Sequence, residues 1–293
     1  MSQHLKKVSF LLLFLSSFTY AQLSDLARIE YVGLPESSKD GSAFDRYRLA
    51  INYPIKIKED TYLFVGLDYS YISYSIDESL INFNPQEIDE FQLLDLNIGY
   101  TFKVNDDWRF GARIQPGFSS NLKARNLSFE DVIISGDAVF IKDKKDNDIP
   151  YRLILGISVS GKGGFPFLPF ISYYRKFHSK WSYNVGVPKM NLQFHASKKN
   201  RIKLVARLDG FRSNLQRGIA VGESQEIASR FRQQLILGGL RYEYKFTDHI
   251  ELYINGSYVI SNTVELRDRS RNTLTELPEV NNFYIKSGIR FKL

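Results

Sequence analysis

A glycine-rich segment of the chain has the spacing of a phosphate-binding loop. Gly156, Gly161 and Lys162 occupy the positions of the two glycines and the lysine in such a loop. The loop works by presenting backbone N–H groups at the start of a helix, and it needs a serine or threonine after the lysine. Gly163 stands at that position, and a Phe-Pro-Phe sequence at 165–167 follows where the helix must begin. We therefore interpret the segment as a strand that ends in a flexible outer loop.

A hydrolase would need a base, and three histidines remain once the first 21 residues are set aside. His178 and His249 lie in short polar turns, whereas His195 alternates with apolar neighbours and should point into an interior. The chain has no cysteine, no Gly-x-Ser-x-Gly motif and no pair of histidines with metal-ligand spacing. We therefore predict no catalytic residue, metal site or cofactor. A serine and a carboxylate that converge from different strands are the alternative.

Charged side chains recur on one face of the predicted strands. On that face arginines and lysines outnumber aspartates and glutamates. A cationic wall would raise the local concentration of anions and favour their passage. The alternative is that these charges pair with one another and fill the interior. The residues that we expect to line the interior are Arg46, Arg48, Asp68, Asp95, Arg109, Arg113, Arg152, Arg207 and Arg290.

Strands with a period of two position these side chains. In residues 44–57, Tyr47, Leu49 and Ile51 face one way, and Arg46 and Arg48 face the other. The same alternation recurs along the chain, with aromatic residues on the apolar faces and charge and glycine on the polar faces. The predicted strands are 26–34, 44–57, 61–75, 91–104, 108–122, 131–142, 151–162, 168–177, 181–187, 190–197, 201–209, 231–246, 250–264 and 282–293.

The links between these strands alternate between short and long. An up-and-down barrel across a membrane divides its two sides in this way, with tight turns inside and long loops outside. The pattern predicts 14 strands, or 12 if the segment 26–34 and one weak later segment are not strands. The short turns are expected at 58–60, 105–107, 178–180, 198–200 and 247–249, and the long loops at about 76–90, 123–130, 210–230 and 265–281.

The length of the strands favours a membrane barrel over a soluble sandwich. Strands in globular proteins commonly run about five or six residues, whereas several here extend over 12 to 15 residues. A tilted transmembrane strand needs about 9–11 residues within the hydrocarbon. Aromatic residues near the ends of the apolar faces suit the membrane interface. We predict an all-β fold, a single up-and-down antiparallel transmembrane β-barrel over residues 22–293.

The first 21 residues have the features of a secretory signal peptide. Lys6 and Lys7 precede an apolar run at 8–18, and Thr19-Tyr20-Ala21 offers a small-x-small cleavage site. The apolar run is too short to cross a bilayer as a helix. We therefore expect cleavage after Ala21, export, and a location in the outer membrane.

The C-terminal residues resemble the β-signal by which the outer-membrane assembly machinery recognises its clients. Lys286, Gly288, Phe291 and Leu293 follow its order of a polar residue, a glycine and spaced hydrophobic residues. The chain departs from the pattern at Leu293, where an aromatic residue is commonest. The resemblance implies that the assembly machinery is a partner of this chain.

The chain after the signal peptide also resembles uncharacterised outer-membrane β-barrel families of Bacteroidota-type bacteria. The segments 169–174 and 181–189, rich in aromatic residues, carry this resemblance. It implies a barrel and an outer-membrane location, and no activity.

These features together favour a porin-like pore for small solutes, with a mild preference for anions. The alternatives are a non-conducting structural or interaction barrel in an envelope complex and, less favoured, a membrane-embedded hydrolase. The basic tract of Arg267, Arg269 and Arg271 lies in a predicted outer loop, where lipopolysaccharide phosphates or solvent are its expected neighbours. The bilayer and lipopolysaccharide are thus expected partners, and nucleic acid is not, because an exported barrel rarely meets it.

Overall fold

The computed structural model describes residues 25–35, 42–124, 126–144, 149–222, 225–278 and 282–292. The predicted signal peptide, with its cleavage site after Ala21, and the terminal Leu293 lie outside these residues. In the described part, fifteen strands form one sheet. They are β1 (Ala27–Leu34), β2 (Ser42–Lys58), β3 (Thr61–Ile76), β4 (Glu90–Lys103), β5 (Trp108–Ser120), β6 (Val132–Lys144), β7 (Tyr151–Val159), β8 (Phe167–His178), β9 (Trp181–Val187), β10 (Lys189–His195), β11 (Asn200–Val221), β12 (Glu226–Lys245), β13 (Ile250–Arg267), β14 (Thr273–Leu277) and β15 (Phe283–Phe291).

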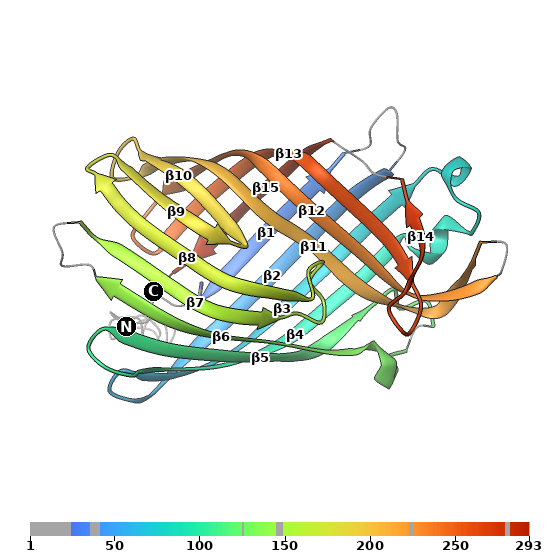
Figure 1. Cartoon of the computed structure of the whole chain (residues 1–293), viewed down its shortest axis with the longest axis horizontal. Helices are drawn as coiled ribbons and strands as arrows, with labels where there is room; N and C mark the ends of the chain where they lie inside the picture. The colour runs from blue at the N-terminus through green and yellow to red at the C-terminus, as the bar shows by residue number, and fades with distance from the viewer. Residues whose placement is uncertain are drawn as a thin grey trace, which may run out of the picture.

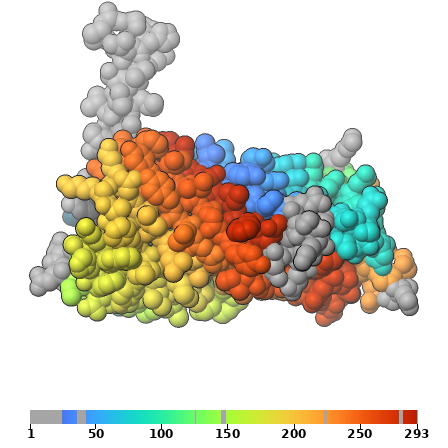
Figure 2. Space-filling view, turned by 90° about the horizontal axis from the view of Figure 1, so that it is seen from above, coloured from blue at the N-terminus to red at the C-terminus, as the bar shows by residue number. Residues whose placement is uncertain are grey.

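The sheet closes on itself (Figure 1). Strands that follow one another pair antiparallel from β1 to β13, and β15 pairs with both β1 and β13. Because β14 pairs with β13 alone, the closed wall has fourteen strands. In Figure 2 the first strands, in blue, lie beside the last strands, in orange and red. The predicted all-β, up-and-down antiparallel barrel of 14 strands is confirmed.

The outer surface of the wall is apolar because successive side chains of a strand point to opposite faces. On β11, Leu204 is 58% exposed, whereas the neighbouring Val205 is 3% exposed. The same alternation exposes Leu49 and Ile51 on β2, on either side of the buried Ala50. A large apolar belt of this kind is characteristic of a surface that contacts lipid.

Short helical turns occupy parts of the links between strands. They are η1 (Glu78–Leu80), η2 (Pro85–Glu87) and η3 (Phe129–Asp131). Within the described residues, no helix has the length and apolar character needed to span a bilayer.

Two of the predicted outer loops are wrong in their bounds. Much of the predicted loop 210–230 is strand, since β11 continues to Val221 and β12 begins at Glu226. The predicted loop 265–281 contains the end of β13 and all of β14. The polar residues of these segments suggest loops, but Phe211, Leu215 and Ile219 alternate with them and are buried on one face of β11. The paired backbone and this buried face extend the sheet beyond the predicted strand ends.

Two strands of the wall are short, and the neighbouring strand β11 extends beyond them. β9 and β10 have seven residues each and are joined through Pro188. Beyond Leu208, whose N–H donates to Pro188 O at 3.0 Å, β11 therefore has no β10 residue beside it. The free edge of β11 meets β5 instead, where Asn214 pairs with Ser120 and the Asn121 N–H donates to Asn214 O at 3.2 Å. This contact brings two strands from opposite sides of the barrel together at the end that carries the long loops.

An aromatic core fills the interior at that end. Phe211 stands at its centre, with ring centroids 5.9 Å from Phe44, 5.2 Å from Phe91 and 5.2 Å from Phe231. These rings come from β2, β4, β11 and β12, and they belong to a buried cluster that also includes Tyr284 of β15. The inner face of these strands is therefore apolar at the end with the long loops and polar elsewhere.

Replacing Phe211 with alanine should destabilise the barrel by about 3–5 kcal/mol, because the change leaves a cavity among three other rings. Urea unfolding of the protein refolded in detergent, followed by loss of heat-modifiable electrophoretic mobility, measures the change. The matched control is Leu204→Ala on the same strand, whose side chain faces outward. Equal losses of stability in the two variants would contradict a packed core at Phe211.

Candidate functional site

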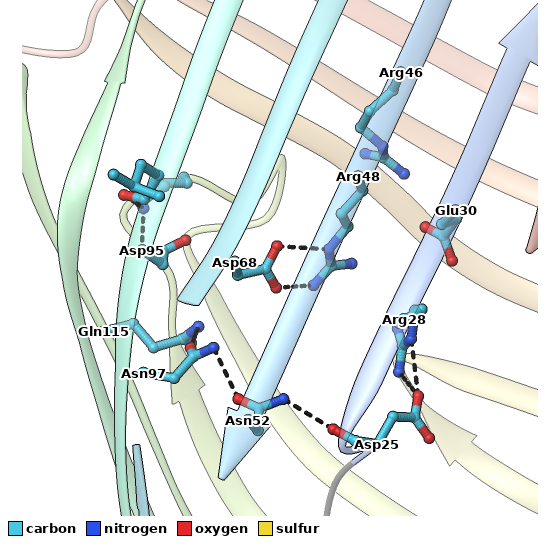
Figure 3. Close-up of polar contacts among 12 residues, drawn as sticks. Asp25, Arg28, Glu30, Arg46, Arg48, Asn52, Asp68, Asp95, Asn97 and Gln115 are labelled. Carbon is cyan, nitrogen blue, oxygen red and sulfur yellow. Dashed lines mark hydrogen bonds and ion pairs between the residues drawn. The ribbon is translucent and has the colours of Figure 1, made fainter. Parts of the chain in front are cut away.

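The nine charged residues expected inside the barrel all form ion pairs on its inner face. Figure 3 shows four of these residues, Arg46, Arg48, Asp68 and Asp95, projecting from β2, β3 and β4 into the interior. The pairs are Arg46 with Asp209 (3.1 Å), Arg48 with Asp68 (2.5 Å), Asp95 with Lys162, Arg109 with Asp60 (3.2 Å), Arg113 with Asp137 (2.7 Å), Arg152 with Asp143 (2.5 Å), Arg207 with Asp209 (3.6 Å), and Arg290 with Glu243 (3.4 Å) and Glu251.

A buried ionic cluster joins β2 to β11 across one side of the interior. Asp209 of β11 pairs with Arg46 of β2 and accepts a hydrogen bond of 2.7 Å from the Tyr284 hydroxyl of β15. Beside it, Glu30 of β1 pairs with Lys286 of β15 and accepts from a tyrosine hydroxyl of β13. A buried charge is costly unless it is paired and hydrogen-bonded. The cluster therefore fills this side of the interior with paired charges, although the Arg46 Nε atom has no hydrogen-bond partner among the described residues.

A second ionic cluster lies near the short turns, and most of its residues are not among the nine predicted from the sequence. Glu243 of β12 pairs with Arg201 at 2.8 Å, Lys203 at 2.9 Å and Arg241 at 2.7 Å. Glu251 of β13 pairs with Arg201 and with two cations of the C-terminal segment, including Lys292 at 2.7 Å. The sequence pattern that could have predicted these residues is their alternation with residues whose side chains face outward, namely Ile202, Leu204, Leu240 and Tyr242.

The opposite side of the barrel holds a cavity of about 690 Å³, which we call the large cavity. Inner side chains of β4 to β7 line it, and the turn residues Asp60 and Asp107 lie at its mouth. A hydrogen bond from Lys144, assisted by Lys142, holds the pKa of the Asp107 carboxyl below its usual range. The large cavity thus opens at the end of the barrel that carries the short turns.

The segment 160–166, which links β7 to β8, folds across the interior above the large cavity. Lys162 forms an ion pair with Asp95 of β4 and donates to Leu94 O at 3.0 Å. Its carbonyl accepts from the Arg212 N–H of β11 at 2.5 Å. Gly161 donates to Ser135 Oγ at 2.9 Å, and a Cβ there would lie 1.9 Å from a methyl group of β6. The expected flexible outer loop is therefore wrong, because contacts with β4, β6 and β11 hold this segment in place.

A smaller cavity of about 290 Å³ lies on the other side of the segment 160–166. Its lining includes Ser160 and Gly161 of the segment together with residues of β6, β11, β12 and β13. Five arginines contribute to this lining. The arginines project from the face of β11 to β13 that lies opposite to the aromatic core, so this cavity lies outside that core, at the end with the long loops.

The histidines form no catalytic arrangement in the part of the chain that the structure describes. His195 Nε2 lies 2.9 Å from Ser182 Oγ, and the ring also contacts the Gln193 amide. Ser182 is fully buried, and the contacts of His195 include no carboxylate that could orient the ring. His178 and His249 lie in or beside turns. No group of three or more metal-binding side chains occurs among the described residues.

The C-terminal residues of the expected assembly signal lie on the closing strand β15. Lys286 and Gly288 lie on the inner face of β15, where Lys286 forms an ion pair with Glu30. Phe291 is on the outer face and is partly exposed, and Leu293 lies beyond the described residues. Their role in assembly stays a prediction.

Solved structures of low similarity include three outer-membrane or transport proteins. An outer membrane channel from Pseudomonas putida F1 has 10% identity, covers 90% of this chain and 94% of its own, and has a TM-score of 0.47. The toluene transporter TodX of P. putida has 12% identity, coverage of 92% and 90%, and a TM-score of 0.36. LpxR from Salmonella typhimurium has 9% identity, coverage of 91% and 100%, and a TM-score of 0.41. At these values none of the three indicates a substrate or an activity.

The sequence comparison is more specific. No curated protein matches the chain. The family described as "Domain of unknown function (DUF6268)" matches residues 18–292, which include the whole closed wall of strands. The chain therefore belongs to the DUF6268 family.

Proposed function

We propose that this protein is an outer-membrane pore for small solutes, with its route on the β5–β8 side of the barrel. The segment 160–166 would close that route in its observed position. The observation that carries the proposal is the position of this segment, which forms an ion pair with Asp95 on the inner face and also lines the smaller cavity at the end with the long loops. A route would need only a displacement of this segment, since the strands of the wall could stay in place.

The order of residues along β5 and β6 supports a continuous route. On β5, Arg113 lines the large cavity, and Gly117, further along, lies against Lys162 of the segment. On β6, Asp137 lines the large cavity, Ser135 holds the segment, and Ile133 lines the smaller cavity. Each strand therefore passes from the large cavity to the segment, and β6 continues to the smaller cavity on the same inner face.

The arrangement of charge favours anions on this route. In the large cavity, Arg109, Arg113 and Arg152 are each paired with an aspartate. In the smaller cavity, five arginines lie near fewer acidic groups. Rings or clusters of cationic side chains at a constriction select anions. We therefore propose that the smaller cavity sets a mild preference for anionic solutes.

A non-conducting barrel that serves a structural or interaction role is the second candidate. The aromatic core and the two ionic clusters favour it, because they fill the side of the interior formed by β1, β2 and β11 to β15. The two candidates differ in one respect, which is whether the segment 160–166 can leave its position.

We also propose a location in the outer membrane, reached by export and insertion through the assembly machinery. The apolar outer surface and the C-terminal motif support this proposal. Lipid and lipopolysaccharide would then surround the barrel. The signal peptide would be removed after Ala21.

Removing both Lys162 and Asp95 by alanine substitution should raise single-channel conductance several-fold in planar bilayers. The ion pair tethers the segment to β4, and removing both partners avoids leaving a buried charge unpaired. In a potassium chloride gradient, the reversal potential should show a preference for chloride.

The matched control for this experiment is the double variant Lys123→Ala with Asp89→Ala, which removes a different ion pair outside the segment. Its conductance should equal that of the unchanged protein. Absence of conductance steps in all three folded proteins would favour the non-conducting barrel, and a preference for potassium would contradict the proposed anion selectivity.

Polar substitution of Phe291 and Leu293, each by asparagine, should sharply lower the amount of protein in the outer membrane. The expected reason is loss of the apolar positions that the assembly machinery recognises. Fractionation and immunoblotting measure the level. The control is Phe283→Asn at the other end of β15, which also faces outward and is 65% exposed. Normal levels of the Phe291 and Leu293 variant would refute the assignment.

A further inference from the structure

The smaller cavity is lined on one side by arginines that come from three strands and a loop. They are Arg212 of β11, Arg230 and Arg232 of β12, Arg267 of β13, and Arg271 in the link between β13 and β14. We call this cavity the arginine cleft. β11, β12 and β13 are neighbours in the sheet, so their pairing brings arginines of three strands and of the following link to one cleft.

Few acidic groups balance these five cations. Glu265 pairs with Arg232 at 3.0 Å and with Arg267 at 2.9 Å. Glu130 also lines the cleft, but it forms an ion pair with Arg269, outside the lining, at 3.0 Å. In the part of the chain that the structure describes, Arg230 and Arg271 form no ion pair. The arginine cleft therefore carries an excess of positive charge.

Backbone carbonyl groups hold two of the arginines in place. Arg212 donates from Nε to Gly163 O at 2.9 Å and from its terminal nitrogen to Ser160 O. Arg232 likewise donates from Nε to Gly164 O at 2.9 Å while it pairs with Glu265. Backbone carbonyls orient these guanidinium groups without cancelling their charge. The arginines are thus positioned before any ligand arrives, which reduces the entropy lost on binding.

The opposite side of the cleft is apolar. Val132 and Ile134 of β6 and Val159 of β7 line it, and all three side chains are exposed. Guanidinium groups present planar pairs of donors that match the oxygen atoms of phosphate, and such charge-assisted hydrogen bonds are among the strongest in proteins. A ligand for this cleft would therefore combine a doubly charged oxyanion with a less polar body that contacts the aliphatic side.

We propose that the arginine cleft binds the phosphate group of a phosphate monoester. The volume of about 290 Å³ suits a phosphate group with a small part of its carrier. Two sources share this chemistry, the phosphorylated headgroup of a lipid in the outer leaflet and a soluble phosphate ester. Binding at this cleft does not require conduction, so it holds for an open or a closed barrel.

The test uses the full protein refolded in detergent and measures binding by isothermal titration calorimetry at constant ionic strength. One arm uses glycerol 3-phosphate as a soluble probe, with chloride as the comparison anion. The other arm uses lipid A in mixed micelles, with dephosphorylated lipid A as the comparison. Binding in the first arm identifies a soluble ester as a ligand, and phosphate-dependent binding in the second arm identifies a lipid headgroup.

The double variant Arg230→Gln with Arg271→Gln should bind the phosphate-bearing probe about tenfold or more weakly, because it removes two charge-assisted hydrogen bonds. The substitutions leave no ion-pair partner behind among the described residues, so the barrel should keep its heat-modifiable mobility. If the double variant does not fold, Arg271→Gln alone, in an exposed link, provides the same test with a smaller loss.

The matched control is Arg269→Gln, which removes a neighbouring arginine whose side chain is 77% exposed and lies outside the cleft lining. Its affinity should equal that of the unchanged protein. Absence of phosphate-dependent binding in both arms would overturn the proposal, as would equal affinity of the Arg230 and Arg271 variant and the unchanged protein. Neither outcome depends on whether the barrel conducts.

Discussion

The pairing of β15 with β1 is the constraint on which the rest of the structure depends. The hydrocarbon of a bilayer offers no hydrogen-bond partner, so each strand that crosses it needs a neighbour on both edges. β15 has β1 on one edge and β13 on the other, with Ile289 opposite Ile29 and Leu252. This pairing fixes which residues face outward around the whole ring, because a slip by one residue would exchange the two faces of a strand.

A closed wall leaves an interior whose contents depend on side chains alone. On the side formed by β1, β2 and β11 to β15, rings and paired charges fill the space, since buried charges need partners and buried rings exclude water. The large cavity remains beside β4 to β7, and the smaller cavity lies where the segment 160–166 meets β6 and β11 to β13. Because β9 and β10 are short, β11 has a free edge beyond Leu208. The segment 160–166 hydrogen-bonds to this edge.

Alternation along the chain predicted the strands well because lipid imposes a simple rule on the outer face. Every second residue must be apolar over the thickness of the membrane, and such a pattern is visible without any knowledge of partners. The rule failed beyond the membrane, where β11 and β12 continue as a paired hairpin over the aromatic core. There Phe211 and Leu215 are apolar on the inner face, and polar residues such as Arg212 lie on the other. The predicted loop 210–230 was wrong for this reason.

The sequence by itself predicted an antiparallel wall of 14 strands, with 12 as the alternative, and the face on which many charged residues lie, since these properties follow from spacing within single strands. Only the tertiary structure decided which charges meet. Arg46 and Asp209 are 163 residues apart, and their pairing depends on which strands face each other across the ring. The inward path of the segment 160–166 and the assembly of the arginine cleft were decided in the same way. Both depend on the short β9 and β10 and on contacts between distant strands, and periodicity within one strand carries no information about such contacts.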